Sequence, residues 1–485
     1  MRLHKVFSYS SVLCLGLVLL VSSCYKDKGN YTYQLPAAPV IRNMDSVYEV
    51  FVGDSLVIAP DVQLQGSTAG QLKYSWTIHV PPVTASDTDR HYEGKDLRII
   101  FGLGPKSFTG RFAIENTANG MKYFKDFTLV GKTAFSKGMT VLSSEAEKTV
   151  LSFIKPDGTV QPYLFEAVNP GQSLPSAPTQ ILAIPEAYQP PVASYWIFGK
   201  SGENTGIQVD ANDFKVIKTL KDNFFDAPKG SLLPNHMFVN PLGVISGIIG
   251  DRLYNGTTST WNQAPTYGMF GQGAAGDYSL SPEMVFDYTG TFGPGNYIGF
   301  DQHKKQFVRF NLYGDATFFG PDYVVKGDSF DPKNVGMDLM HLQQIAGGLC
   351  FGYFIAPNDS IYECSMKTNF NGPFEFEALT RRPFARQELI SPATLWAATS
   401  SQILFFSYKD KVYRYNPINE DFRLVKTAFG GKTVTMVKLQ DANTLVVGTE
   451  GTLYFLDIRT GQDGTLIKKI EGLPGKIIDM AFREQ

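Results

Sequence analysis

Short strand-and-turn segments recur along most of the chain, and this recurrence limits the possible folds more than any other feature. From residue 133 onward, runs rich in Val, Ile, Phe and Tyr alternate with tight turns at Gly, Asn and Asp. The clearest examples are "DKVYRYNP" and "EGTLYFLDIRTG", each followed by a further strand-like run. Equivalent points lie roughly 40 to 55 residues apart, which is close to the length of known propeller blades. The pattern predicts a β-propeller of about seven blades over residues 133–485, with two unrelated β-sandwiches as the alternative.

Local turn signals mark where these strands should reverse, because Gly, Asn and Asp tolerate the backbone angles of tight turns. Turns are expected at Asp157-Gly158, Asp210 to Asp213, Gly250-Asp251, Gln302 to Lys305, Ala356 to Asp359, Lys409 to Lys411 and Glu450-Gly451.

Composition agrees with an all-β protein and excludes one class of partner. Among 485 residues there are 36 Phe, 24 Tyr, 46 Gly and 28 Pro, and apolar residues rarely recur at the helical period. The formal net charge of −2 over so long a chain provides no basic surface for nucleic acid.

The N-terminus has the order of a secretory signal: positive charge, an apolar run, then small residues. Arg2 and Lys5 precede an apolar run of about ten residues, which is too short to span a bilayer as a helix. The segment "LVSSC" that ends at Cys24 resembles the bacterial lipobox, in which the cysteine becomes the lipidated first residue of the mature protein. Residues 1–23 are therefore predicted to be a lipoprotein signal peptide and residues 24–35 a polar stalk that follows the lipid anchor.

Residues 36–132 form a strand-rich block of domain size. The segment "QLKYSWTIHV" alternates apolar residues on one face and carries Trp76, and the Asn119-Gly120 pair marks a hairpin. About seven strands with a central tryptophan predict an immunoglobulin-like sandwich without the disulfide of antibody domains.

This block resembles a known family. The segments "YSWTI", "LRIIF" and "GRFAIENTANGMKYFKDFTLVG", with the lead-in "CYKDKGNYTY", are similar to the PKD-like family of Gram-negative bacterial lipoproteins. The resemblance covers the N-terminal quarter and implies an outer-membrane location, often beside nutrient-uptake machinery, without an established activity. The charges after Cys24 are only Lys26-Asp27-Lys28, so a cell-surface or a periplasmic orientation stays open.

No catalytic or metal-binding constellation stands out. The string "GQGAAG" at Gly271 to Gly276 precedes no helical pattern and is expected to be a connecting loop. The segment "KGDSFDPKN" around Asp328 lacks the spacing of a calcium loop. The histidines are scattered and are expected on the surface or on strand faces, namely His79, His91, His236, His303 and His341. The sequence thus predicts no metal, no cofactor and no catalytic residue.

Cysteine and tryptophan supply the remaining candidates. Cys350 and Cys364 flank a predicted turn, with residue 351 expected opposite Cys364, and they either form a disulfide or stay as two buried thiols. Trp76, Trp196 and Trp396 are expected in the core. Trp261 lies in the polar stretch "NGTTSTWNQAPTYG", where it either stacks on a sugar or partner or caps a neighbouring blade.

Together these features predict a lipid-anchored, non-enzymatic binding or assembly protein of the outer membrane. The expected partners are the membrane, through the lipid, a carbohydrate or protein ligand, and an outer-membrane transporter complex. Two alternatives stay open: a propeller enzyme, hydrolase or lyase, acting on polysaccharide, and a purely structural subunit of an outer-membrane complex.

Overall fold

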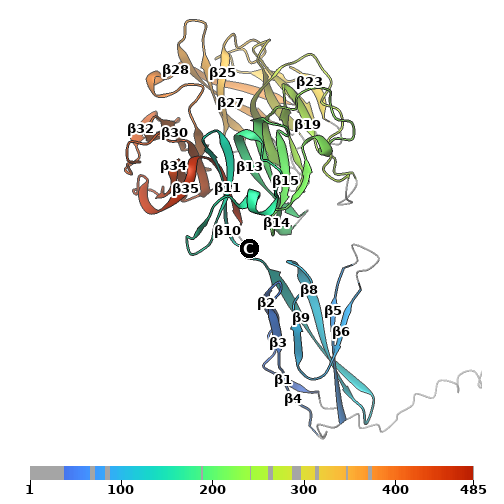
Figure 1. Cartoon of the computed structure of the whole chain (residues 1–485). Coiled ribbons are helices and arrows are strands. Elements are labelled where there is room, and N and C mark those ends of the chain that lie inside the picture. The colour runs from blue at the N-terminus through green and yellow to red at the C-terminus, as the bar shows by residue number, and fades with distance from the viewer. Residues whose placement is uncertain are drawn as a thin grey trace, which may run out of the picture. The chain divides into compact units, whose positions relative to one another are not determined.

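The computed structural model describes residues 38–65, 71–81, 88–186, 189–240, 242–259, 266–286, 296–311, 316–345, 348–369 and 374–483 (Figure 1). Almost all regular structure in these ranges is β-strand. The chain divides into two compact units, of which the first comprises the described residues up to Gly102 together with Ser107–Val130. The second comprises Leu103–Lys106 and the described residues from Gly131 onward.

The first unit is a β-sandwich. A five-stranded sheet has the order β2-β9-β8-β5-β6, in which β9, β8, β5 and β6 are antiparallel, and two strand pairs, β3-β7 and β1-β4, accompany it. The strands are β1 (Val40–Arg42), β2 (Val47–Phe51), β3 (Ser55–Ile58), β4 (Asp61–Gln63), β5 (Leu72–His79), β6 (Arg90–Glu93), β7 (Leu97–Ile100), β8 (Ser107–Asn116) and β9 (Met121–Lys132).

Alternation along these strands builds the sandwich core. On β5, Trp76 and Ile78 are fully buried, and the Trp76 ring packs 4.2 Å from that of Phe112 on β8. The strands before and after Gly53 enter different sheets, because β2 pairs with β9 whereas β3 pairs with β7. The predicted sandwich and its hairpin before Met121 are confirmed by the pairing of β8 with β9.

The second unit is built mainly from antiparallel sheets in up-and-down order, except that β24 pairs in parallel with β28 at the edge of its sheet. The first three are β13 (Ser176–Glu186), β14 (Gln189–Ser201), β15 (Gly206–Asp210) and β16 (Val216–Thr219); then β17 (Pro234–Val239), β18 (Ile245–Ile249) and β19 (Arg252–Asn255); then β20 (Leu280–Phe286), β21 (Asn296–Asp301), β22 (Gln306–Asn311) and β23 (Thr317–Gly320). The next two are β24 (Val324–Lys326), β25 (Asp338–Gln344), β26 (Leu349–Ile355), β27 (Ile361–Asn369) and β28 (Glu375–Pro383); then β29 (Trp396–Ala398), β30 (Leu404–Tyr408), β31 (Lys411–Asn416) and β32 (Asp421–Leu424).

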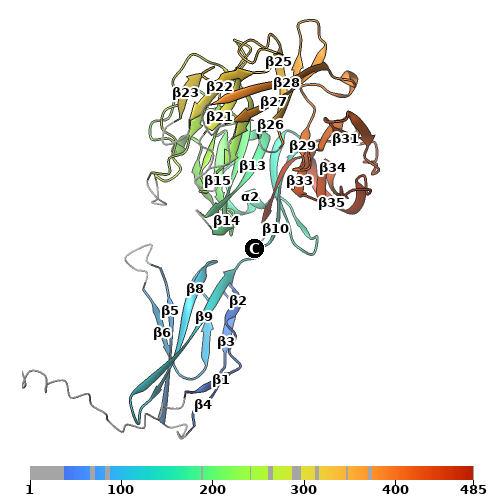
Figure 2. The same ribbon diagram turned by 180° about the vertical axis from the view of Figure 1, so that it is seen from behind.

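A sixth sheet joins both ends of this unit. Its order is β12-β11-β10-β35-β34-β33, and its strands are β10 (Gly138–Glu145), β11 (Lys148–Ile154), β12 (Val160–Gln161), β33 (Met436–Asp441), β34 (Thr444–Asp457) and β35 (Thr465–Arg483). The first half of β35 pairs with β34, and its second half pairs with β10. The sheet is therefore two blades that share one bent strand, and the strands near the two ends of this unit lie side by side in both views (Figures 1 and 2).

The bend in β35 requires glycine. Gly475 has a φ of +59°, and a Cβ atom there would collide with the carbonyl oxygen of Ser144 at the end of β10. Short helical turns lie between the strands, α2 (Leu164–Val168), η2 (Lys221–Asn223) and η3 (Gln387–Leu389).

Apolar clusters lie between consecutive sheets and close the unit into a ring. One cluster joins Leu151 and Phe153 on β11 to Ile181 on β13 and its neighbours. Further clusters join each sheet to the next around the ring. The last, with Val446 and Ile477, returns to the sheet that contains β10. Counted with β35 divided at its bend, the described strands form seven groups. The predicted all-β fold with a β-propeller is confirmed, and the exact number of blades stays a prediction.

Most hairpin turns fall where the local signals placed them. The turn expected at Glu450-Gly451 does not form, because both residues lie inside the continuous strand β34, and the chain reverses between Asp441 and Thr444 instead. A second difference is one of register. Cys364 lies opposite Gly352, not residue 351. The loop between Ile355 and Ile361 has one residue more than expected, because Asp359 adopts a left-handed conformation, with a φ of +63°, and extends the turn.

Candidate functional site

Polar and aromatic side chains gather on one strand of each blade. We call these the first strands: β13, β17, β20, β25, β29, β33 and the second half of β35. These first strands contact one another in sequence, β35 with β13, β13 with β17, β17 with β20 and β20 with β25, and further on β29 with β33 and β33 with β35. They are the innermost strands of the ring. We call seven of their residues, one from each strand, the axial residues: Gln180, His236, Glu283, His341, Trp396, Lys438 and Asp479.

Glu283 and His341 form a carboxylate–imidazole pair across two sheets. The Oε2 atom of Glu283 on β20 lies 3.4 Å from Nδ1 of His341 on β25, and the two side chains remain 27% and 13% exposed. The other ring nitrogen, Nε2, lies 3.3 Å from Oε1 of Gln343. Both ring nitrogens thus face oxygen acceptors, so the imidazole is fixed in its orientation and can donate on either side.

An aromatic stack supports this imidazole from the next sheet. The ring of His341 is stacked on that of Trp396, with centroids 4.8 Å apart and planes 7° apart. Tyr353 stacks on Trp396 as well, at 4.7 Å. Trp396 is half-buried, so part of its indole surface stays accessible next to the polar pair. Such a combination of an aromatic face with fixed polar groups is common in sites that bind sugars and other polar ligands.

The protein environment shifts two of the axial pKa values. Burial lowers the pKa of His236, and the negative charge of Glu283 opposes that effect only in part. For Glu283, burial acts to raise the pKa, but His341, His236 and the backbone N–H of Leu342 together outweigh it and hold the pKa below its usual range. Near neutral pH the site therefore presents an ionised carboxylate and a neutral His236.

The remaining polar axial residues connect neighbouring sheets. Lys438 Nζ donates to Asp479 Oδ1 at 2.7 Å, while Asp479 Oδ2 accepts the backbone N–H of Ile181 at 3.0 Å. Asp479 thus joins the last strand to the sheets on both sides of it. Gln180 similarly donates to the carbonyl of Met237 and accepts its N–H. These residues hold the ring closed rather than offering free polar groups.

Another acid lies between two sheets and, unlike Glu283, is not accessible to solvent. Glu363 on β27 is fully buried and accepts hydrogen bonds from Tyr415 at 2.7 Å and Tyr353 at 3.1 Å. Arg382 donates to it at 3.0 Å and also reaches Glu420. Burial raises the pKa of Glu363 in spite of these partners. Glu363 therefore connects two sheets. It is not a candidate for ligand binding, because its side chain is not accessible from solvent.

The structure places the candidates from the sequence as follows. Cys24 and Trp261 lie outside the described residues. Cys350 and Cys364 are both buried free thiols in one apolar cluster, and burial raises their pKa, to about 12 for Cys364. Gly271 to Gly276 form a loop that leads into strand β20 without a helix.

One expectation about the tryptophans needs correction. Trp76 and Trp196 are buried as predicted, but Trp396 is only half-buried and contacts His341. His236 and His341 lie on strands, as expected, and both approach Glu283, which the sequence did not predict. His303 in a turn is exposed, and His79 pairs with Asp89 on the sandwich surface.

Two further observations concern the described part of the chain. None of its helices is long and apolar enough to cross a membrane. No three of its His, Cys, Asp or Glu side chains converge closely enough to hold a metal ion.

Comparison with known proteins confirms the resemblance at the N-terminus. Residues 24–178 match the model of the PKD-like family. No similar protein was found among the curated proteins.

Solved structures are similar at low identity. A quinonprotein alcohol dehydrogenase-like protein of Bacteroides thetaiotaomicron is 12% identical, with a TM-score of 0.41, over 92% of this chain and 99% of that one. The extracellular domain of a putative one component system from B. thetaiotaomicron is 11% identical, with a TM-score of 0.34, over 75% of this chain and 53% of that one. A protein of unknown function from Bacteroides caccae is 10% identical, with a TM-score of 0.33, over 60% of this chain and all of that one (100%). Structural similarities with such low TM-scores do not support any inference about function.

Proposed function

We propose that this protein is a lipid-anchored, non-enzymatic binding protein of the bacterial outer membrane, associated with uptake of a glycan or peptide. The observation that carries the proposal is the group formed by Glu283, His341 and Trp396. It combines an ionised acceptor, an oriented donor and a half-buried aromatic face, and none of the three side chains is fully buried. A ligand with hydroxyl or amide groups next to a flat apolar face, such as a sugar ring, matches this chemistry.

The test is a glycan and peptide binding screen on the full-length protein in detergent, followed by Glu283→Gln. This substitution keeps the side chain's shape but removes the charge that faces His341. We expect the affinity for a ligand found in the screen to fall roughly tenfold or more, because hydrogen bonds to charged groups contribute more than neutral ones. His303→Gln is the matched control, since His303 is exposed in a turn. Equal affinity in both variants would contradict a role for the axial residues.

One observation favours an enzyme as the second candidate, because a carboxylate paired with an imidazole can also transfer protons. Incubating each bound glycan with the protein and analysing the products separates the two. A binding protein leaves the glycan intact. Cleavage that disappears in Glu283→Gln, while binding remains, would make the protein a polysaccharide-cleaving enzyme. A screen without any ligand would favour the third candidate, a structural subunit.

The membrane anchor is proposed at Cys24. Cys24→Ala removes the thiol that would carry the lipid, so the variant is expected to leave the membrane fraction, since acyl chains supply the binding free energy. Fractionation with a high-salt wash checks this. Retention of the variant in the washed membranes would show that the anchor lies elsewhere.

A further inference from the structure

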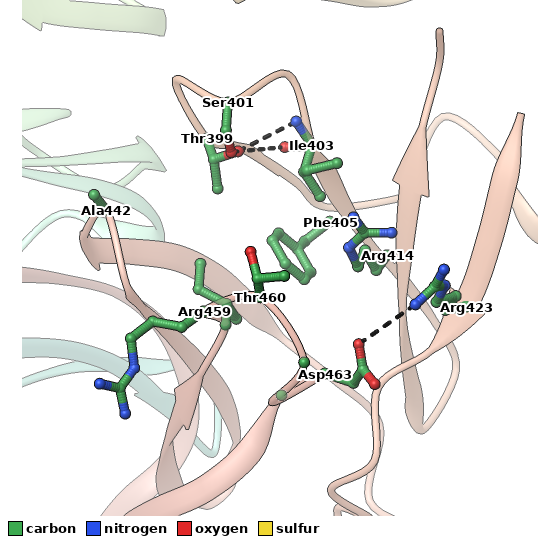
Figure 3. A pocket seen from close by; sticks show the side chains of 13 residues that line it. Thr399, Ser401, Ile403, Phe405, Arg414, Arg423, Ala442, Arg459, Thr460 and Asp463 are labelled. Carbon is green, nitrogen blue, oxygen red and sulfur yellow. Dashed lines mark hydrogen bonds and ion pairs between the residues drawn. The ribbon is translucent and has the colours of Figure 1, made fainter. Parts of the chain in front are cut away.

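A polar cavity of about 230 Å³ lies between the sheet formed by β29 to β32 and the blade formed by β33, β34 and the first half of β35 (Figure 3). Thr399 and Ser401 reach it from the turn after β29, and Thr460 and Asp463 from the loop after β34. Pockets for drug-sized ligands are usually about 300 to 1,000 Å³. This cavity therefore suits a ligand no larger than a single sugar or a small organic acid.

Two arginines face this cavity from directly opposite positions on adjacent strands. Arg414 on β31 pairs with Arg423 on β32 in the sheet register, and Phe405 on β30 lies opposite Arg414. All three residues line the cavity. Like charges in directly opposite positions destabilise a sheet unless an anion lies between them.

Among the described residues, the two guanidinium groups share one close oxygen atom, and Arg423 has a second, more distant carboxylate partner in Asp463. Oδ2 of Asp421 lies 3.1 Å from Arg414 and 2.8 Å from Arg423. Arg459, a third arginine of the lining, extends away from this pair (Figure 3) and is bound to Asp457. The charged residues that line the cavity are three arginines and one acid, Asp463, so guanidinium groups outnumber carboxylates on its wall.

The opposite side of the cavity is suited to hydroxyl groups. Asp463 is 3.8 Å from Arg423 and 3.6 Å from Lys426, distances beyond those of strong ion pairs, so its carboxylate retains acceptor capacity. The hydroxyls of Thr399 and Ser401 lie 2.9 Å apart at the rim. A guanidinium group can donate to a carboxylate, and an ionised aspartate can accept from a hydroxyl, so the cavity offers partners for both groups of one ligand.

We propose that this cavity binds a small hydroxylated carboxylate, of which a sugar acid is the simplest example. The ligand's carboxylate lies between Arg414 and Arg423 and relieves their repulsion, while its hydroxyls donate to Asp463. The site is distinct from the axial residues and does not rest on the function proposed for them.

Titration calorimetry on the full-length protein in detergent, at low salt, tests this with D-glucuronate and with D-glucose as its neutral counterpart. We expect glucuronate to bind and glucose not to bind. Arg414→Gln and Arg423→Gln should each weaken glucuronate binding about tenfold or more. Arg459→Gln, the matched control, should bind as the parent does, because its guanidinium does not face the pair. Raising the salt concentration should weaken binding through screening.

Several outcomes would overturn the proposal: no binding of glucuronate, equal binding of glucose, or the same loss in Arg459→Gln as in the other two variants. Thermal melting of each variant identifies any that fails to fold. If Arg414→Gln does not fold, Arg423→Gln decides the test, because its side chain is 55% exposed and contributes less to packing.

Discussion

The sandwich and the propeller use charge in different places. In the sandwich, the ion pairs lie on the outer face of the sheet, as between Arg111 and Asp126, whose side chains are 55% and 53% exposed. In the propeller, the fully buried Glu363 and the largely buried Asp479 lie where one sheet meets the next. A sandwich closes by packing two apolar faces, whereas a ring of sheets also has to fix the angle between neighbours. Directional polar contacts at the junctions meet that need, and they make the propeller more sensitive than the sandwich to loss of a single charge.

The largest effect is expected from removing the strand that closes the ring. Deletion of residues 475–485 takes away the partner of β10 and the Asp479 contacts to both neighbouring sheets. We expect the propeller to lose its cooperative unfolding transition, while the sandwich keeps its own. Thermal melting followed by circular dichroism, with limited proteolysis, measures both units. A truncated protein that melts like the parent would show that closure through β35 does not stabilise the ring.

The next largest effect concerns the buried acid between two sheets. Glu363→Ala leaves Arg382 and two tyrosine hydroxyls without their common acceptor, and breaking a buried pair typically costs about 3–5 kcal/mol of unfolding free energy. Urea denaturation measures this. Glu93→Ala in the sandwich, whose side chain is 77% exposed, is the control and should unfold at the parent's urea concentration. Equal shifts in both variants would remove the contrast between the two units.

A smaller effect should appear as a dependence on pH. The folded state lowers the pKa of His236 below its ordinary value of 6.5, so the unfolded chain binds this proton more readily. The stability contributed by neutral His236 is complete above about pH 6.5 and is lost as the pH falls below that value. In His236→Asn the corresponding part of the pH dependence should vanish. Urea denaturation of both proteins between pH 5 and 8 compares them, and parallel curves would contradict the assignment.

The smallest effect is expected on the sandwich surface. Arg111→Ala removes an ion pair that is exposed to solvent and screened by salt, so its melting temperature should stay within experimental error of the parent's. A clear destabilisation would mean that surface charge matters as much in the sandwich as junction charge does in the propeller.

Features that depend on neighbouring residues could be predicted from the sequence. The hairpin before Met121 and the turn at Gly250 follow from short-range turn preferences, and the Trp76 strand follows from alternation. The register at Cys364 was not predicted correctly, because the conformation of Asp359 adds one residue to the turn. Turn chemistry alone does not specify that choice.

The candidate site could not be predicted from the sequence in the same way. Glu283, His341 and Trp396 come from three sheets and are brought together only when the ring forms. Taken singly, each looked like an ordinary strand residue. The sequence does contain a pattern that marks these residues: in each repeat a polar or aromatic residue directly precedes an apolar one. The seven occurrences are "QIL", "HMF", "EMV", "HLQ", "WAA", "KLQ" and "DMA". Aligning the repeats on these steps would have selected the axial residues.

The shared strand β35 also governs when this protein can finish folding. Arg483 bonds to the carbonyl of Phe135, 348 residues earlier in the sequence, so the blade that contains β10 is incomplete until residues 476–483 are available. Pairings between such distant segments form slowly. Until then β10 presents an unpaired edge, and exposed edges are the places where chains add to one another and aggregate. Before the ring closes, this edge therefore has to be kept from pairing with other chains.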